Sequence, residues 1–211
     1  MIRPVLFDYF RSSASYRVRI ALALKGVDHD RVEVNLLEGG QREDSYRARN
    51  PQALVPMLEV DGRRIVQSLA IIQWLDRTYP DPPLVPTDPF DQAHVQALAL
   101  AIACDIHPLN NLRVLKHLAG PLGAPQEVRD EWYRHWVKEG LAALEATAAE
   151  RSGRFLFGDS PTLADICLVP QMFNARRFAV PLEPYPLLVR VDAEASRHEA
   201  FASAHPDRFQ P

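Results

Sequence analysis

A proline-rich stretch divides the chain into two parts of different character. Residues 80–89 read Pro-Asp-Pro-Pro-Leu-Val-Pro-Thr-Asp-Pro and hold five of the 18 prolines in the 211-residue sequence. Proline fixes φ and removes a backbone donor, so the stretch favours a stiff, non-helical linker. Strand signals lie before it and helical patterns follow it. We predict an α/β domain over residues 1–80, a linker over 81–88 and an all-helical domain over 89–211.

The first domain is predicted to begin with a strand, a helix and a second strand. An apolar run indicates a strand over residues 3–8, and a helix over 15–25 ends at Gly26. Alternating polar and apolar residues indicate a strand over 31–35. This order implies a parallel pair of strands joined by a right-handed crossover. A short polar helix over 44–49 follows.

A hairpin is the next expected element. Residues 55–60 and 63–66 have strand character and flank Asp61-Gly62, a strong hairpin signal. Pro56 stands at the start of the first of these strands. The Val55–Pro56 bond is therefore a candidate cis peptide, which would leave the backbone groups of Val55 available. A helix over 69–79 follows, with Ser68 as its expected N-cap.

The second domain is predicted to contain long helices. The first covers residues 89–118, with a bend at His107-Pro108, where a backbone donor is missing. The second covers 126–150, and its core candidates are Trp132, Trp136, Leu141 and Leu144.

A third helix of this domain is expected to form its buried centre. Thr162 and Asp165 have capping-box spacing, and Ile166 to Val169 is apolar nearly all round. A final helix is expected to run to about residue 200, and the tail from His205 is expected to be loose.

Charge and composition exclude some classes of function. The net charge is −3 and no basic run occurs, so nucleic-acid binding is not indicated. No apolar stretch approaches the ~20 residues of a membrane span, and the start does not resemble a signal peptide. Cys104 and Cys167 are expected to be reduced core residues, which favours the cytoplasm. The seven histidines are scattered, without the paired spacing of a metal site.

The turn between the first strand and the first helix concentrates hydroxyl and guanidinium groups. Residues 10–19 read Phe-Arg-Ser-Ser-Ala-Ser-Tyr-Arg-Val-Arg. A helix N-terminus offers unpaired N–H groups and the positive end of the helix dipole, so an anion such as a thiolate can bind there. A serine cap is the ordinary structural explanation, but one serine suffices as a cap and the turn has three.

Motifs spread in order along nearly the whole chain resemble those of the zeta class of cytosolic glutathione transferases. Residues 11–22, Arg-Ser-Ser-Ala-Ser-Tyr-Arg-Val-Arg-Ile-Ala-Leu, are similar to the active-site signature of that class. Further matching stretches are Asn50-Pro51 with Val55-Pro56, Gln67–Ile72, Asp105–Asn111, Ala164–Gln171 and Asn174–Phe178. The resemblance implies a thioredoxin-like N-terminal domain and an all-α C-terminal domain, which together form the glutathione transferase fold.

The activity that the resemblance implies is the cis–trans isomerisation of a conjugated diacid, with glutathione as cofactor. A thiolate that adds reversibly to the double bond permits rotation, and glutathione is returned unchanged. Maleylacetoacetate, an intermediate of aromatic amino acid breakdown, is the first expected substrate and fumarylacetoacetate the product. Maleylpyruvate isomerisation and general glutathione transfer are the alternatives. The resemblance also implies a homodimer.

The resemblance implies roles for residues of both domains. Ser12 would stabilise the thiolate, with Ser13 and Ser15 as alternatives. Diacid carboxylates would be bound by Arg11 and Arg177, with the neighbouring Arg176 as the alternative to Arg177. The remaining residues implied to bind glutathione are Arg17, Gln41, Arg42, Val55, Pro56, Gln67, Ser68, His107, Asn111 and Arg113. His107 could equally serve only the helix bend beside Pro108.

One position departs from the zeta pattern. The signature usually carries cysteine where this chain has Ala14, so a mechanism that needs a protein thiol in the loop is in doubt here. The serine mechanism is unaffected. A thioredoxin-type oxidoreductase is excluded because the turn has no Cys-x-x-Cys. A non-catalytic binding module would not need the serine turn, Val55-Pro56 and Gln67-Ser68, all of which are present.

Overall fold

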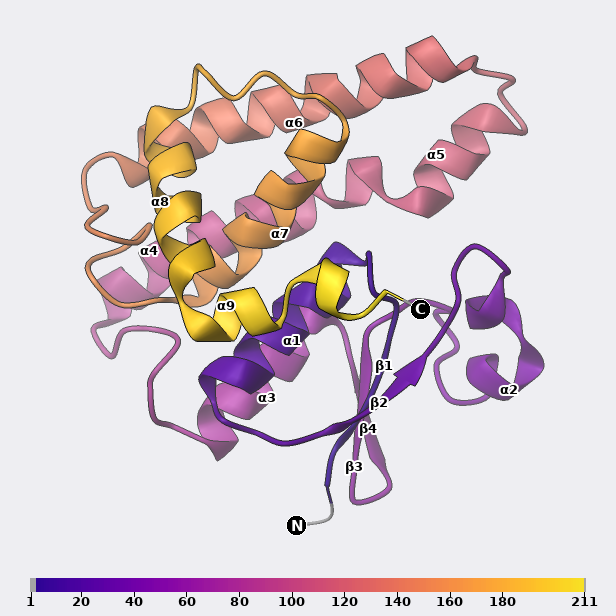
Figure 1. The fold of residues 1–211 in the computed structure, drawn as a ribbon, viewed down its shortest axis with the longest axis horizontal. Coiled ribbons are helices and arrows are strands. Elements are labelled where there is room, and N and C mark those ends of the chain that lie inside the picture. The colour runs from indigo at the N-terminus through magenta and orange to yellow at the C-terminus, as the bar shows by residue number, and fades with distance from the viewer. Residues whose placement is uncertain (1–2, 211) are drawn as a thin grey trace. The chain divides into compact units, whose positions relative to one another are not determined.

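The computed structural model describes residues 3–210, which form two compact units (Figure 1). The first contains residues 3–83 together with 198–210, and the second contains 84–197. The C-terminal residues thus pack on the first unit, whereas the sequence assigned them to the helical domain. The Tyr16 hydroxyl donates to the Phe201 carbonyl at 3.4 Å, and Arg19 Nε donates to the Ala204 carbonyl at 3.1 Å.

A four-stranded mixed sheet forms the centre of the first unit. Its strands are β1 (Val5–Asp8), β2 (Asp30–Glu33), β3 (Met57–Val60) and β4 (Arg63–Val66), in the spatial order β2-β1-β3-β4. β1 is parallel to β2, with Val5 opposite Asp30, and antiparallel to β3. β3 and β4 form the predicted hairpin, whose turn residues Asp61 and Gly62 both have positive φ. The strand predicted over residues 31–35 begins and ends earlier and forms one edge of the sheet.

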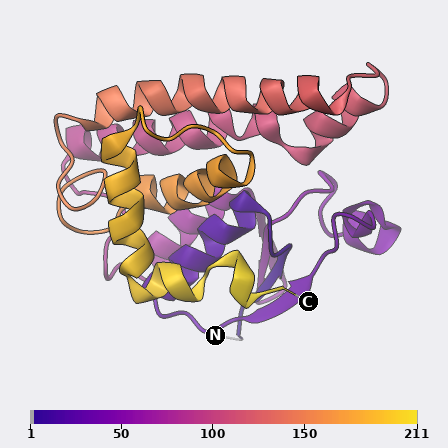
Figure 2. The same ribbon diagram turned by 45° about the horizontal axis from the view of Figure 1, so that its top comes forward.

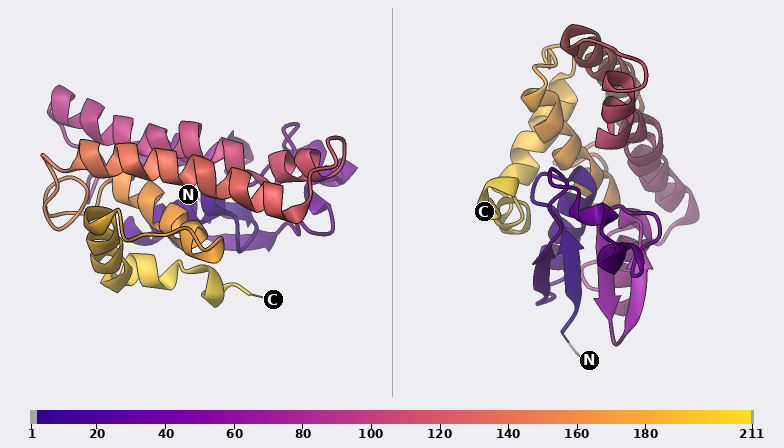
Figure 3. Two further views of the ribbon diagram at one scale, coloured as in Figure 1. Left: turned by 90° about the horizontal axis from the view of Figure 1, so that it is seen from above. Right: turned by 90° about the vertical axis from the view of Figure 1, so that its right-hand side faces the viewer.

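Helices α1 (Ser13–Leu24) and α3 (Ser68–Thr78) pack together in this unit, and α2 (Asp44–Arg47) is a single turn. α1 ends as expected, because Gly26 adopts φ +60° just after the C-cap Lys25. α9 (Glu199–Ser203) lies beside α1 (Figure 3). The fully buried apolar residues of the unit include Leu6, Val18, Ile20, Leu22, Met57, Leu58, Ile71, Ile72 and Leu75.

The second unit is helical, and α7 (Leu163–Arg177) packs against both α4 (Pro89–Leu100) and α8 (Pro186–Arg197) (Figure 2). The run from Ile166 to Val169 is buried, which confirms its predicted place in the core. The capping box is present, since Thr162 and Asp165 exchange both of its hydrogen bonds. Among residues 3–210, no helix has the length and apolar character required to cross a bilayer.

The single helix predicted over residues 89–118 is wrong, because the chain breaks it into shorter pieces. α4 passes into a π-helix, Ala101–Ile106, and then into a 3₁₀ turn, Pro108–Asn110, before α5 (Leu112–Ala119) begins. Pro108 cannot donate a helical hydrogen bond. Asn111 then caps α5, since its Oδ1 accepts from the Arg113 N–H at 3.1 Å.

Two expected core residues of α6 (Gln126–Ala148) are only half-buried. Leu141 and Leu144 are buried as predicted, but Tyr133 and Val137 take the core positions instead of Trp132 and Trp136. The Trp132 indole N–H donates to the Leu109 carbonyl at 2.8 Å, and this polar contact fits a ring that is only half-buried.

Two further expectations are wrong. Cys104 is exposed on the π-helix, whereas Cys167 is buried as predicted, and within residues 3–210 neither cysteine forms a disulfide. The tail from His205 is not loose: residues Pro206–Arg208 form a 3₁₀ turn, and the Phe209 ring lies under two guanidinium groups, at 4.7 Å and 5.3 Å. Contacts with residues far away in the sequence order this segment.

Candidate functional site

Ser12 is the N-cap of α1 and lies at the centre of the strand-to-helix turn. Its backbone N–H donates to the Tyr9 carbonyl at 2.9 Å, and its Oγ accepts from the Ser15 N–H at 3.2 Å. A hydroxyl that accepts in this way keeps its own hydrogen as a donor. The structural explanation and the chemical one are therefore compatible at Ser12.

The three serines of the turn differ in burial. Ser12 is half-buried, whereas Ser13 is 6% exposed and Ser15 is fully buried. Ala14, which stands where the zeta signature has cysteine, is also half-buried. Of the three hydroxyls, that of Ser12 is therefore the most accessible to a ligand at the helix N-terminus.

Arg11 directly precedes Ser12 in the chain, and its side chain contacts two aromatic residues. Its Nη2 donates to the Tyr9 hydroxyl at 3.1 Å, and its guanidinium lies 5.1 Å from the centre of the Phe10 ring. The Tyr9 and Phe10 rings meet edge to face at 4.9 Å. These contacts orient the guanidinium of the residue that directly precedes Ser12 in the chain. Sequence reasoning missed Tyr9, because no local pattern marks a tyrosine at a strand end as a partner for arginine.

Arg17 and Ser68 connect α1 with the start of α3. Arg17 is 2% exposed, and its Nη1 donates to the Ser68 Oγ at 3.4 Å. The sequence predicted Ser68 as the N-cap, and this is wrong. α3 begins at Ser68 itself, and Gln67 takes the cap position without a side-chain cap bond. The buried guanidinium therefore adds positive charge at a helix N-terminus, where a carboxylate can bind.

Gln67 has an uncommon backbone conformation, with φ +72° and ψ 120°. Non-glycine residues avoid this region, and such strain is concentrated at functional sites. The exposed Gln67 side chain donates from Nε2 to the Gln52 Oε1 at 2.9 Å. The backbone therefore presents the Gln67 side chain just before the N–H groups of α3.

The segment before Pro56 is braced by side chains from the preceding turn. The Val55–Pro56 bond is cis, as the sequence suggested, and a second cis bond joins Asp81 to Pro82. The carbonyl of Leu54 accepts from the Tyr46 hydroxyl at 2.7 Å and from the Asn50 Nδ2 at 2.8 Å. Asn50 thus has a supporting role, and the Asn-Pro turn signature was the available signal for it.

Gln41 and Arg42 lie in a 3₁₀ turn, Gly40–Arg42, and differ in exposure. Gln41 is 9% exposed, and its Oε1 has no hydrogen-bond partner within residues 3–210. Arg42 is exposed. A buried amide oxygen without a partner is costly, so Gln41 is the better candidate to meet a polar ligand group.

In the second unit, the structure places three predicted site residues around the break between α4 and α5. The His107 N–H donates to the Ile102 carbonyl at 2.9 Å, an i to i−5 bond that closes the π-helix. Asn111 caps α5, and Arg113 is exposed on its first turn. π-helical turns are rare and occur frequently at functional sites.

Arg176 and Arg177 are adjacent at the end of α7 but have different partners. Arg176 Nη2 lies 2.6 Å from Asp192 Oδ2 on α8. Arg177 Nη1 donates to the neutral Asn174 Oδ1 at 3.0 Å, and its guanidinium lies 5.4 Å from the Phe178 ring centre. That ring stacks on Tyr133 at 3.6 Å. Burial raises the pKa of Tyr133, and the nearby positive charge of Arg177 opposes the shift.

Within residues 3–210, no group of three or more histidine, cysteine, aspartate or glutamate side chains is arranged to bind a metal ion. The candidate site of the first unit instead consists of hydroxyls, amides, guanidiniums and two helix N-termini. Such groups bind anions and carboxylates.

Family models of glutathione S-transferases match both units. The N-terminal domain model covers residues 6–83, and the C-terminal domain model covers residues 126–199. The chain belongs to the glutathione transferase family. A curated relative, the maleylacetoacetate isomerase of Rhizobium meliloti (strain 1021), is 49% identical over 98% of both chains.

Solved structures of this family confirm the fold and the zeta class. One is the holo structure of a maleyl pyruvate isomerase, described as a bacterial zeta-class enzyme, with a TM-score of 0.95, 44% identity and 98% coverage of both chains. Another is the maleylacetoacetate isomerase of Anaeromyxobacter dehalogenans 2CP-1 with glutathione bound in its active site. It has a TM-score of 0.89 and 45% identity, over 99% of this chain and 97% of that one.

Proposed function

We propose that this transferase-family chain catalyses the glutathione-dependent cis–trans isomerisation of a conjugated diacid, with maleylacetoacetate as the first candidate substrate. The observation that carries the proposal is the half-buried residue Ser12 at the N-terminus of α1, directly preceded in the chain by Arg11, whose guanidinium is held by the Tyr9 hydroxyl. Its relative from Rhizobium meliloti, at 49% identity, is a maleylacetoacetate isomerase.

The residues of the first unit fit the polar groups of glutathione. The N-terminus of α3, with Gln67, Ser68 and the buried Arg17 behind them, suits the carboxylate of a γ-glutamyl group. The backbone of Val55 suits an extended peptide. The unpartnered Oε1 of Gln41 can accept a hydrogen bond, and Arg42 can meet a terminal carboxylate.

When bound, glutathione supplies a thiol whose anion adds reversibly to a conjugated double bond. The Ser12 hydroxyl acts on the sulfur as a hydrogen-bond donor and stabilises its negative charge. It is not a base, because an ordinary serine does not take up the proton. The dipole of α1 adds to the stabilisation, so the pKa of the thiol falls below its free value of about 8.5.

Arginines of both domains are assigned to the diacid. Arg11 lies next to Ser12, where its charge can stabilise negative charge that develops on the substrate during reaction. We assign the second carboxylate to Arg177, since Arg176 is committed to Asp192. His107, Asn111 and Arg113 are proposed to assist glutathione binding from the helical domain.

Maleylpyruvate is the second candidate substrate. The specific observation in its favour is the TM-score of 0.95 to the zeta-class maleyl pyruvate isomerase. Both candidates are cis-unsaturated diacids, so the same arginines could serve either. General conjugation of apolar electrophiles is disfavoured because it does not need arginines at the site.

The deciding experiment is a spectrophotometric assay of both diacids, each with and without glutathione. We expect isomerisation that depends on glutathione but does not consume it, and the ratio of the two kcat/KM values identifies the substrate. A chain that binds glutathione yet isomerises neither diacid would instead be a conjugating transferase or a binding module.

The proposal includes a homodimer in the cytoplasm that acts in aromatic amino acid breakdown. Sedimentation velocity with dilution tests the oligomeric state. Growth of a deletion strain on tyrosine, compared with growth on an unrelated carbon source, tests the pathway. Both experiments are independent of the kinetic assay.

A further inference from the structure

The carboxylate of Asp8 is fully buried and shared by two arginines. Asp8 is the last residue of β1 and has no exposed surface. Its Oδ2 lies 2.7 Å from Arg19 Nη1, and its Oδ1 lies 2.6 Å from Arg31 Nε. A buried carboxylate is costly unless charged partners compensate it, so this ion network strongly constrains the end of β1.

Every nitrogen of the Arg19 guanidinium makes a hydrogen bond. Besides the bond to Asp8, Nη2 donates to the Phe10 carbonyl at 2.9 Å, and Nε donates to the Ala204 carbonyl at 3.1 Å. Phe10 stands two residues before Ser12. One side chain that is 2% exposed therefore joins the strand end, the backbone of the catalytic turn and the C-terminal segment.

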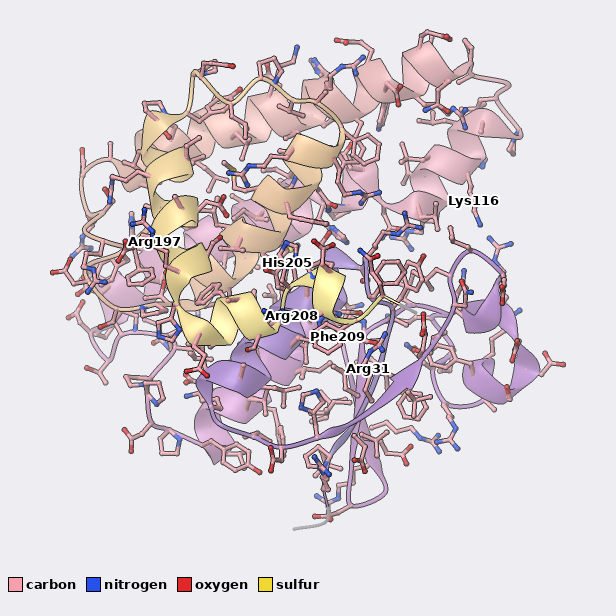
Figure 4. The ribbon with its side chains drawn as sticks, in the orientation of Figure 1. Arg31, Lys116, Arg197, His205, Arg208 and Phe209 are labelled. Atoms are coloured by element: carbon pink, nitrogen blue, oxygen red, sulfur yellow. The ribbon has the colours of Figure 1, made fainter. Side chains whose placement is uncertain are left out.

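The C-terminal segment covers this network. The Phe209 ring centre lies 4.7 Å from the Arg19 guanidinium carbon and 5.3 Å from that of Arg31. Phe209 and Arg31 are labelled in Figure 4. The segment is tied to α1 a second time through the bond from Tyr16 to the Phe201 carbonyl. A desolvated guanidinium over an aromatic face is stabilised by cation–π attraction.

We propose that Arg19 is a positioning residue for the Ser12 turn, and that residues 204–209 keep Arg19 in place. By holding the Phe10 carbonyl, Arg19 restricts the backbone that leads into Ser12, whose hydroxyl must point accurately at its ligand. A displacement of about 1 Å can reduce catalysis by about 100-fold. The inference rests on the role of Ser12 in the proposed function.

The first test is Arg19→Lys. A lysine can still pair with Asp8, but its single ammonium cannot also reach the Phe10 and Ala204 carbonyls in the same geometry. In the protein without glutathione, we expect hydrogen exchange at the Ser15 and Tyr16 amides, both bonded to Ser12, to accelerate by about 10-fold or more. The matched control is Arg64→Lys, at an exposed arginine that is paired with Glu59. We expect it to leave the exchange of the Ser15 and Tyr16 amides unchanged.

The second test uses Phe209→Leu, which retains apolar cover but removes the aromatic face. For both variants we expect the pKa of bound glutathione's thiol, followed by ultraviolet titration of the thiolate, to rise towards the free value of about 8.5. We expect kcat to fall by about 10- to 100-fold, with KM for glutathione changed less.

A purely structural network would give a different result. If Arg19→Lys lowers the Tm but leaves both the amide exchange of the turn and the thiol pKa as in the parent, the positioning role is wrong. Failure of the proposed function is distinguishable, because the parent would then isomerise neither diacid while the exchange and thiol measurements could still be made.

Discussion

Arg176 and Asp192 form an ion pair of 2.6 Å in which the carboxylate side chain is only 5% exposed. This pair joins the end of α7 to α8. Because neighbouring residues on a helix point about 100° apart, Arg177 cannot share this direction. It lies instead over the rings of Phe173 and Phe178. The two adjacent arginines therefore have separable roles.

Substitution of these arginines should separate binding from stability. Arg177→Ala is expected to raise KM for the diacid by about 10- to 100-fold, because a charge-assisted bond to a carboxylate is lost, with little change in Tm. Arg176→Ala should leave KM near the parent value but destabilise the fold by about 1–3 kcal/mol, because it leaves Asp192 buried without this partner.

Steady-state kinetics and thermal denaturation of the two variants provide the check. Arg177→Lys is a useful additional variant, since it keeps the charge but loses the planar guanidinium that can bind a carboxylate through two hydrogen bonds. Its KM should lie between those of the parent and Arg177→Ala. The reverse pattern, with KM raised only by Arg176→Ala, would contradict the assignment of Arg177.

Removal of the Ser12 hydroxyl should affect turnover more than cofactor binding. Ser12→Ala is expected to lower kcat by about 100-fold, as for loss of one preorganised donor, while the Kd for glutathione changes only slightly. The variant also loses the cap bond to Ser15, which costs about 1 kcal/mol of stability.

Ser12→Thr separates these effects, because it restores a capping hydroxyl and should recover part of kcat. Calorimetric binding and single-turnover kinetics are the measurements. An unchanged kcat in Ser12→Ala, with the loss appearing in Ser13→Ala or Ser15→Ala, would transfer the role to that serine.

Asp165 is expected to be critical for the stability of the helical unit. Its Oδ1 accepts from the Leu156 N–H at 2.8 Å, and its Oδ2 accepts from the N–H and hydroxyl of Thr162 at 2.8 Å and 2.9 Å. Asp165→Asn places an amide N–H₂ against a backbone donor, so at pH 4 we expect the free energy of unfolding in urea to fall by about 2–3 kcal/mol. A change below 0.5 kcal/mol would contradict this.

The same residue should make stability depend on pH. Burial raises the pKa of Asp165 from 3.8 to about 6, and its hydrogen-bond donors only partly offset the shift. Between about pH 4 and pH 6, the Asp165 carboxyl is therefore protonated in the folded state but ionised in the unfolded state. The contribution of this group to stability is greatest below pH 4 and falls as pH rises to 6. Urea titrations of the parent and Asp165→Asn across this range should show that the difference between their free energies of unfolding becomes smaller as the pH rises.

Gly140→Ala tests the packing of α6 on the π-helix. A Cβ at this position would come within 2.2 Å of the Ile106 Cγ1, in a side chain that is 1% exposed. Helix propensity alone predicts stabilisation by about 1 kcal/mol, whereas overpacking predicts a loss of about 1–3 kcal/mol. We expect a net loss of stability by denaturant unfolding, and a gain would show that Ile106 moves at little cost.

Local sequence signals predicted much of the fold and part of the candidate site. The Asp61-Gly62 hairpin, the Gly26 helix end and the Thr162–Asp165 capping box are each specified within a few residues. The prediction of one helix over residues 89–118 was wrong because the apolar periodicity continues across the break. Asn111 caps a separate helix after the break. Helix phase was also misjudged in α6, where Tyr133 rather than Trp132 is buried.

The sequence by itself determined the family, the order of elements and the serine turn, because these depend on short runs of residues. Only the tertiary structure decided that Arg176 is paired with Asp192, that Gln41 is buried, and that the C-terminal segment covers Arg19. The partners in such pairs are far apart in the chain, and their interaction depends on distance and burial. Neither quantity exists until the strands and helices pack together.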